Sequence, residues 1–149
     1  MSDHVFPTIL IADDQAGQRA VLDMLLTLDG YEVVAKEDGR ETLEYLQDHT
    51  PGLIILDINM PHMNGIEICT RIKRIKRLNN VPVVILTGLK DEKILTEARL
   101  AKADRVIHKP LEGKDFREVV KDLLRQSKEA SLAAEAKAKA VDFSGLPNA

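Results

Sequence analysis

Acidic side chains follow two of the most apolar runs in the sequence. Asp13 and Asp14 come directly after TILIA, and Asp57 comes directly after LIIL. Alone, such a carboxylate is explained equally well as a helix cap or a turn residue. If the two runs form neighbouring strands, however, the three carboxylates converge on one pocket. Two like charges ~4 Å apart repel by about 4 kcal/mol at an effective dielectric of about 20, so either protons or a cation must neutralise them.

The types of donor at this point favour a hard cation. The three groups offer only carboxylate oxygens, with neither a histidine nor a cysteine cluster among them. Such a set suits Mg²⁺ above all, or Mn²⁺, and Mg²⁺ keeps several waters and takes few protein ligands. A site of this kind has open positions for a phosphoryl group. With the ion bound, Asp57 could act as a nucleophile, because carboxylates form covalent phosphoryl intermediates.

Two donors for phosphoryl oxygens follow later apolar runs. Thr87 and Gly88 come after PVVIL, and Lys109 comes shortly after RVI. The Thr87 hydroxyl and the Lys109 ammonium could bind the oxygens of a phosphoryl group, while Gly88 leaves room for it. Each residue alone is equally well explained as the end of a strand or a solvated charge. Because all of them occupy the same place in the fold, one shared site is favoured.

Short apolar runs and segments with helical spacing alternate along the chain. The runs are continuous rather than alternating, which is typical of strands covered on both faces of a parallel sheet. We expect strands at residues 8–12, 32–36, 53–56, 82–86 and 105–107. The five intervening helices are marked by Val21, Leu22, Leu25 and Leu28; Leu43 and Leu46; Ile68, Cys69, Ile72 and Ile75; Ile94, Leu95, Ala98 and Ala101; and Phe116, Val119, Val120, Leu123 and Leu124. This alternation predicts a doubly wound α/β domain, in which ligands gather beyond the carboxyl ends of the strands.

Composition narrows the class of protein further. The 149 residues carry a net charge of −3 and only 3% aromatic residues, which disfavours direct binding of nucleic acid. No apolar run approaches the roughly 20 residues that span a bilayer, and the N-terminus does not have the pattern of a secretory signal. The single cysteine, Cys69, excludes an internal disulfide and is most simply a small core residue. These features predict a cytoplasmic protein that contacts neither nucleic acid nor membrane.

Four motifs together resemble the receiver domain of two-component response regulators, of the single-domain type found in chemotaxis. They are IADD at residues 11–14, ILDINMPHMNG at 55–65, VVILTG at 83–88 and HKP at 108–110. The resemblance covers about residues 8–125 and implies a flavodoxin-like sheet of order 2-1-3-4-5 with five helices. We therefore divide the chain into a receiver domain, residues 1–126, and an Ala-rich extension, residues 127–149. The extension either prolongs the fifth helix or forms a linker, and it ends in a tail.

The resemblance also implies a function. Asp57 would accept a phosphoryl group from the phosphohistidine of a sensor histidine kinase or a histidine phosphotransfer protein. Mg²⁺ would be bound by Asp14, Asp57 and the main-chain carbonyl of Asn59, and Asp13 would act through water. The protein would be a signalling switch that catalyses only its own phosphorylation and dephosphorylation, not an enzyme in the usual sense. Its downstream protein target is not indicated, and a phosphorylation-linked homodimer remains open.

The resemblance assigns Thr87 and Lys109 to the phosphoryl group and implies a cis Lys109–Pro110 peptide bond. One position departs from the family. Receivers usually carry Tyr or Phe three residues before the conserved lysine, and that ring reorients when the hydroxyl at the Thr87 position moves. Here the residue is Val106, which cannot swing as a ring does. We expect uptake of the phosphoryl group to be unaffected. We expect the signal to leave not through the face of the fourth helix, fifth strand and fifth helix, but through another surface or through order in the loop after Thr87.

Two alternatives belong to other classes of function. An aspartate-nucleophile phosphohydrolase commonly needs a second Asp two residues after the nucleophile, and Asn59 at that place counts against this class. A receiver-like module that binds partners without phosphorylation is the other alternative. The presence of every site residue argues against it, although Val106 leaves some room for it.

A cationic segment, RIKRIKR at residues 71–77, lies near the end of the third predicted helix. Cations near a helix C-terminus suit the helix dipole, so a solvated helical face is favoured. The alternative is a docking patch for an acidic partner.

Overall fold

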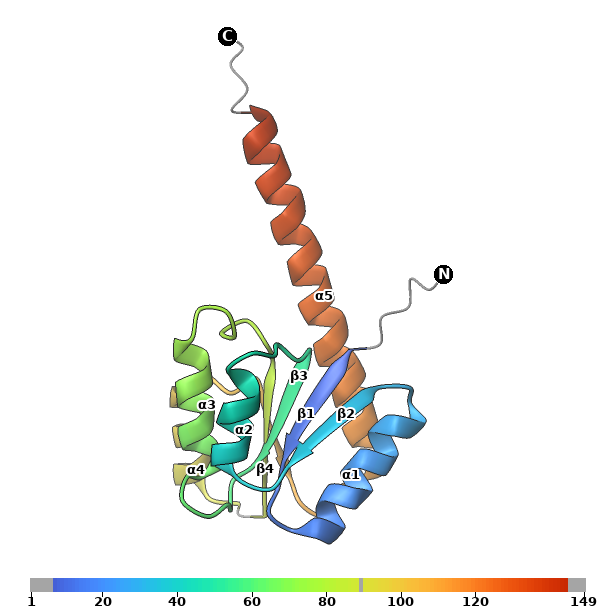
Figure 1. The fold of residues 1–149 in the computed structure, drawn as a ribbon, viewed down its shortest axis with the longest axis vertical. Helices are drawn as coiled ribbons and strands as arrows, with labels where there is room; N and C mark the ends of the chain where they lie inside the picture. Colours follow the sequence, from blue (N-terminus) through green and yellow to red (C-terminus); the bar gives the residue numbers. More distant parts are fainter. Residues whose placement is uncertain (1–6, 89, 145–149) are drawn as a thin grey trace.

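A central parallel sheet organises the molecule, and helices cover both of its faces (Figure 1). The computed structural model describes residues 7–88 and 90–144. Its five strands are all parallel and lie in the order β2-β1-β3-β4-β5. The predicted doubly wound fold, its five helices and its strand order are therefore confirmed.

Three strands, β3, β4 and β5, extend one residue further toward the predicted site than the sequence suggests. They are β1 Thr8–Ala12, β2 Glu32–Lys36, β3 Leu53–Asp57, β4 Val83–Thr87 and β5 Arg105–His108. The helices are α1 Ala16–Leu28, α2 Gly39–Leu46, α3 Gly65–Arg74, α4 Glu92–Leu100 and α5 Gly113–Ser144. Asp57 and Thr87 are thus the last residues of β3 and β4 rather than the first residues of the following loops, so ladder hydrogen bonds fix their main chains.

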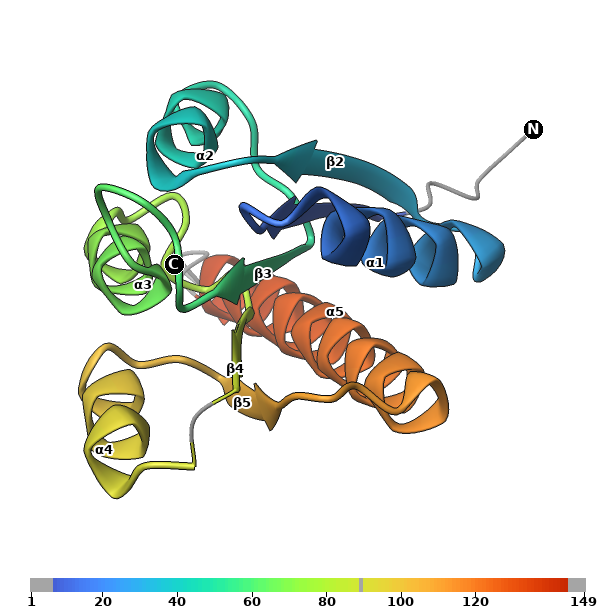
Figure 2. The same ribbon diagram turned by 90° about the horizontal axis from the view of Figure 1, so that it is seen from below.

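Alternate residues of each strand serve two separate apolar cores. Leu10 and Ile54 pack with α2, α3 and α4, whereas Ile9 and Ile55 pack with α1 and α5. Figure 2 shows this three-layer arrangement, with α1 and α5 on one side of the sheet and the other three helices opposite. Because both faces are covered, every residue of β3 and of β4 is buried, which explains why their apolar runs are continuous.

Three residues that helical spacing assigned to buried stripes are exposed. Val21 and Leu28 in α1 expose 49% and 72% of their surface, and Ile75 exposes 39%. In α1 the buried stripe consists of Leu22 and Leu26, one turn apart, which turns Val21 and Leu28 toward solvent. Ile75 is the C-cap of α3 and has extended backbone angles, so the helical period no longer applies to it.

The long helix α5 includes most of the Ala-rich extension, for which a longer fifth helix and a linker were the alternatives. Its 32 residues correspond to about 48 Å of helix. Phe116 and Val120 anchor its first half in the core, while its second half runs beyond the sheet (Figure 1). Residues 127–144 therefore prolong the fifth helix, and residues 145–149 lie outside the described part of the chain. Within residues 7–88 and 90–144, no helix has the length and apolar character needed to cross a membrane.

Cys69 is a core residue of α3, as predicted. It is fully buried, and its thiol donates a hydrogen bond to the carbonyl oxygen of Ala101 at 3.4 Å. Burial raises the pKa of the thiol to about 11. We expect iodoacetamide at about pH 8 to alkylate the folded protein at least ~10-fold more slowly than the urea-unfolded protein. A mass-spectrometric time course checks this, and equal rates in the two states would contradict the buried placement.

Candidate functional site

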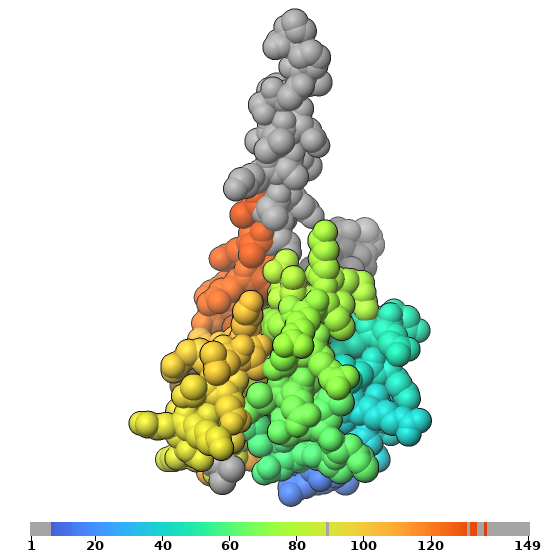
Figure 3. All heavy atoms as spheres, turned by 90° about the vertical axis from the view of Figure 1, so that its left-hand side faces the viewer, coloured from blue at the N-terminus to red at the C-terminus, as the bar shows by residue number. Residues whose placement is uncertain are grey.

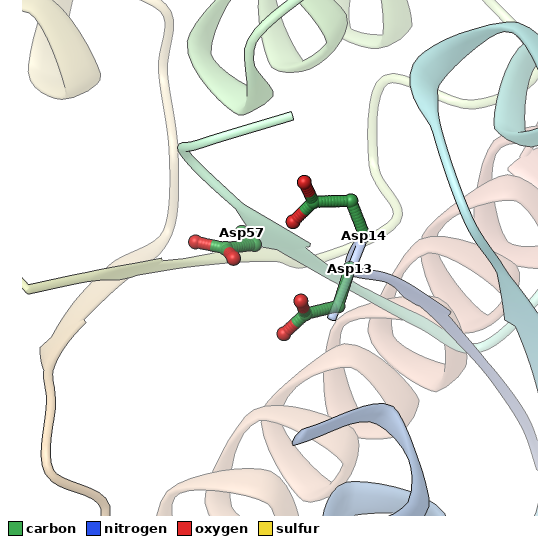
Figure 4. Close-up of side chains that lie close together, drawn as sticks. All are labelled: Asp13, Asp14 and Asp57. Atoms are coloured by element: carbon green, nitrogen blue, oxygen red, sulfur yellow. The ribbon is translucent and has the colours of Figure 1, made fainter. Parts of the chain in front are cut away.

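The register of β1 and β3 puts three carboxylates at one end of the sheet. Ala12 pairs with Leu56, so Asp13 lies beside Asp57 at the next position. One carboxylate oxygen each from Asp13, Asp14 and Asp57 lies within 4.8 Å of the others. Figure 4 shows the three side chains clustered at the ends of the two strands. The convergence expected for neighbouring strands is therefore present in the structure.

The cluster concentrates negative charge in a partly buried place. Asp13 and Asp57 expose 0% and 2% of their surface, while Asp14 is exposed. Burial raises the pKa of the Asp13 carboxyl above its ordinary value, and the nearby Asp57 charge raises it further. A hydrogen bond from the Gln15 main chain and the charge of Lys109 lower this pKa, but the net shift remains upward. The oxygen-only donor set and this excess negative charge both fit a hard divalent cation.

The first turn of α1 holds Asp13 in place. The main-chain N–H of Gln15 donates to Asp13 Oδ1 at 2.9 Å, and the Gln18 side-chain amide donates to Oδ2. Arg19 donates to the main-chain oxygen of Asp13 at 2.7 Å and lies 3.6 Å from a carboxylate oxygen of Glu37. Sequence reasoning missed Gln18 and Arg19. Their signal is their place in the first turn of the helix directly after the acidic pair.

Two other predicted site residues, Lys109 and Asn59, contact Asp57, and Thr87 is joined to Lys109. Lys109 Nζ lies 3.1 Å from Asp57 Oδ1, and the main-chain N–H of Asn59 donates to the same oxygen at 3.3 Å. The main-chain N–H of Lys109 donates to the carbonyl oxygen of Thr87 at 2.8 Å, and Thr87 is fully buried. The Lys109–Pro110 peptide bond is cis. The structure thus gathers a nucleophile-type carboxylate and a cation at the carboxyl end of the sheet, next to the strand that ends on Thr87.

A close backbone contact shapes the loop after Asp57. The main-chain N–H of Gly65 donates to the carbonyl oxygen of Ile58 at 3.2 Å. A Cβ atom at Gly65 would lie 2.5 Å from the carbonyl oxygen of Asp57, closer than real Cβ atoms come. Asn64 caps α3 by accepting from the main-chain N–H of Glu67 at 2.9 Å. The cap and the glycine together bring the start of α3 against the end of β3, a role that sequence reasoning did not assign to Gly65.

Val106 lies away from the three carboxylates, in β5. It is half-buried against the core shared by α2, α3 and α4. A hollow of about 270 Å³ lies beside it, lined also by Leu95, Arg99, Ala103, Asp104 and Arg105. The position at which the family usually carries an aromatic ring therefore borders the surface between α4 and β5.

The family model of the response regulator receiver domain matches residues 9–121. The chain therefore belongs to the receiver domains of two-component response regulators. These domains are signalling switches rather than conventional enzymes, and they bind Mg²⁺ at an acidic pocket of the kind formed here by Asp13, Asp14 and Asp57. Membership of this family also implies interaction with a histidine kinase or phosphotransfer partner.

Relatives of known class support this assignment. A probable transcriptional regulator, ycf27, of Cyanophora paradoxa is 31% identical over 125 residues, which cover 84% of this chain and 51% of the relative. Histidine kinase P4 of Formosa agariphila is 37% identical over 117 residues, which cover 78% of this chain but 8% of the kinase. The chain spans about half the length of the ycf27 relatives that it matches.

Solved structures of receiver domains share the fold. The receiver domain of a signal transduction histidine kinase from Syntrophus aciditrophicus has a TM-score of 0.77 and 33% identity, covering 80% of this chain and 91% of that one. A CheY-like response regulator receiver domain from Methanospirillum hungatei has a TM-score of 0.80 and 25% identity, covering 85% of this chain and 99% of that one.

Proposed function

We propose that this protein is a phosphorylation-dependent switch in which Asp57 accepts a phosphoryl group from the phosphohistidine of a histidine kinase or phosphotransfer protein. The observation that carries the proposal is the buried Asp57 carboxylate, which lies close to the carboxylates of Asp13 and Asp14 and 3.1 Å from the Lys109 ammonium. Relatives described as transcriptional regulators and as a histidine kinase support the same class of pathway.

The metal site is part of the proposal. Asp14, Asp57 and the main-chain carbonyl of Asn59 would hold Mg²⁺, or Mn²⁺, and Asp13 would act through a bound water. When bound, the ion supplies positive charge to the phosphoryl oxygens. The contacts that Gln15 and Gln18 make to Asp13 support this division of roles, because both oxygens of that carboxylate already accept hydrogen bonds from the protein.

The chemical step needs positioning and charge more than acid–base help. An oxygen of Asp57 forms a bond to phosphorus while the phosphorus–nitrogen bond of the phosphohistidine breaks, and the imidazole leaves with the electron pair of that bond. Lys109 and the Thr87 hydroxyl bind the phosphoryl oxygens. Attack of water on phosphorus later regenerates Asp57 and releases inorganic phosphate. A phosphohydrolase is not supported, because Asn59 offers an amide where such enzymes commonly use a carboxylic acid.

The output would be a protein contact, either with a downstream target or with a second copy of the chain. Movement of Thr87 and Lys109 toward the phosphoryl oxygens would pull on the adjacent ends of β4 and β5. Since Val106 has no ring to reorient, the change would leave through the loop after Thr87 rather than through the face formed by α4, β5 and α5.

A direct experiment tests the proposal. The protein is incubated with acetyl phosphate and Mg²⁺, and its intact mass is measured before peptide mapping. We expect the gain of one phosphoryl group, located on Asp57, and no gain when EDTA replaces Mg²⁺. No gain with Mg²⁺, or a phosphoryl group on another residue, would contradict the proposed function.

A further inference from the structure

Two side chains of the cationic segment at residues 71–77 bind other parts of the fold. Lys73 Nζ donates to the carbonyl oxygen of Val81 at 2.8 Å and lies 2.9 Å from a carboxylate oxygen of Asp104. Arg77 donates to the carbonyl oxygen of His49 at 3.1 Å, near the C-terminal end of α2. These two cations therefore hold the segment against the rest of the fold, and their charges and donors are paired within the protein.

The remaining cations of this region are not satisfied. Five exposed side chains form no ion pair and no side-chain hydrogen bond with any residue in the described part of the chain: Arg71, Arg74, Lys76, Arg99 and Lys102. The first three belong to α3 and the turn after it, and the other two lie at the C-terminal end of α4. A chain with a net charge of −3 therefore carries unpaired cations along α3, in the turn after it and at the C-terminal end of α4.

A hollow between α3 and α4 brings cations of the two helices together. Its volume is about 260 Å³, and its lining consists of Thr70, Lys73, Arg74, Leu100, Ala101 and Lys102. We call it the α3–α4 groove. Figure 3 looks onto this face, where α3 (green) and α4 (yellow) lie side by side. Leu100 exposes 77% of its surface, so the groove combines an exposed apolar side chain with flexible cations.

The groove is separate from the candidate phosphoryl site. The carboxylate cluster lies at the carboxyl ends of the strands, and in a parallel α/β fold the helices return to the opposite end (Figure 1). Residues at the C-terminal ends of α3 and α4 therefore lie at the far end of the domain from Asp57. A ligand in the groove would not compete with the chemistry at that site.

We propose that the α3–α4 groove binds an acidic segment of a partner protein, with an apolar side chain of that segment seated on Leu100. The two helices present their C-terminal ends here, so no row of main-chain N–H groups is available for a compact phosphate. The cations are instead spread over two helices on long side chains, which matches carboxylates spaced along a peptide. Cations also offset the helix dipoles, but that explanation gives no reason for an exposed leucine among them.

A labelled peptide tests this proposal. The probe is a fluorescein-labelled peptide of about twelve residues, in which two leucines are flanked by Asp and Glu, and binding is followed by fluorescence anisotropy. We expect the double variant R74E/K102E to bind at least ~10-fold more weakly than the wild type. Leu100→Ser should also weaken binding, by about threefold or more, because it removes the apolar contact with the peptide.

The matched control is the double variant K114E/K128E, which changes the net charge equally at two exposed lysines of α5. It should bind the peptide within about twofold of the wild type, since exposed charges a Debye length of about 8 Å or more away are largely screened. Circular dichroism verifies that every variant is folded. In ¹⁵N NMR spectra of the wild type, the peptide should shift the amides of Thr70, Arg74 and Lys102.

Three results would overturn the proposal. They are no measurable binding to the wild type, equal weakening in the two double variants, and preference for a single-stranded oligonucleotide of equal charge. Asp57→Asn should bind the peptide as the wild type does, because the groove is remote from that residue. Loss of phosphoryl uptake and loss of peptide binding are therefore distinguishable, and either proposal can fail without the other.

Discussion

Asp57→Asn is expected to abolish uptake of the phosphoryl group from acetyl phosphate while leaving the fold intact. The amide has nearly the shape of the carboxylate but is not a nucleophile. Stability should change little, because the substitution removes both a repulsion from Asp13 and an attraction to Lys109, whose ammonium lies 3.1 Å away. We expect a free energy of unfolding within about 1 kcal/mol of the wild type. Intact mass and urea denaturation measure the two quantities.

The matched control is Asp48→Asn, the same chemical change at an exposed carboxylate. It should take up the phosphoryl group at the wild-type rate. Uptake by Asp57→Asn at that rate would mean that another residue is phosphorylated, and the role given to Asp57 would be wrong.

Gly65→Ala is expected to lower the free energy of unfolding by about 2 kcal/mol, because overpacking forces the backbone to move. The added Cβ would lie 2.5 Å from the carbonyl oxygen of Asp57, and an oxygen held in the main chain of a buried strand cannot yield as a flexible side chain can. The same displacement should slow phosphoryl uptake, since it shifts the residue that carries the nucleophile. Urea denaturation and the rate of mass gain give both effects.

Gly17→Ala serves as the control. No atom lies within 4 Å of a Cβ at Gly17, and the residue belongs to α1, where alanine favours the helix by about 0.5 kcal/mol or more. This variant should be at least as stable as the wild type and should take up the phosphoryl group normally. Wild-type stability and rate in Gly65→Ala would show that its approach to Asp57 does not fix the loop.

The sheet and the carboxylate cluster could be predicted because their causes are local in the sequence. A strand buried on both faces must be apolar throughout, so LIIL before Asp57 is a clear signal. Parallel strands end at the same edge, which brings Asp13 to Asp57 once β1 and β3 are neighbours. The exposed Val21 and Leu28 could not be distinguished from core residues, because the apolar residues of α1 form more than one stripe.

Contacts between distant segments escaped prediction for a different reason. The segment RIKRIKR gives no sign that Lys73 is paired with Asp104, or that Arg77 donates to the carbonyl oxygen of His49. These partners belong to other elements, and only the tertiary packing brings them together. Gln18 was missed for a local reason, because its bond to Asp13 depends on where α1 begins. Which cations remain unsatisfied, and hence where a partner could bind, is readable only from the folded chain.

The shared metal site is tested by titrating the metal-free protein with Mg²⁺ in an isothermal titration calorimeter. If Asp13, Asp14 and Asp57 hold the ion together, the wild type should bind a single Mg²⁺. Asp14→Asn and Asp57→Asn should each bind it at least ~10-fold more weakly, as expected when a ligand or its support is lost. Asp48→Asn should bind it as the wild type does. Wild-type affinity in both site variants, or no binding by the wild type, would show that these carboxylates do not hold the ion.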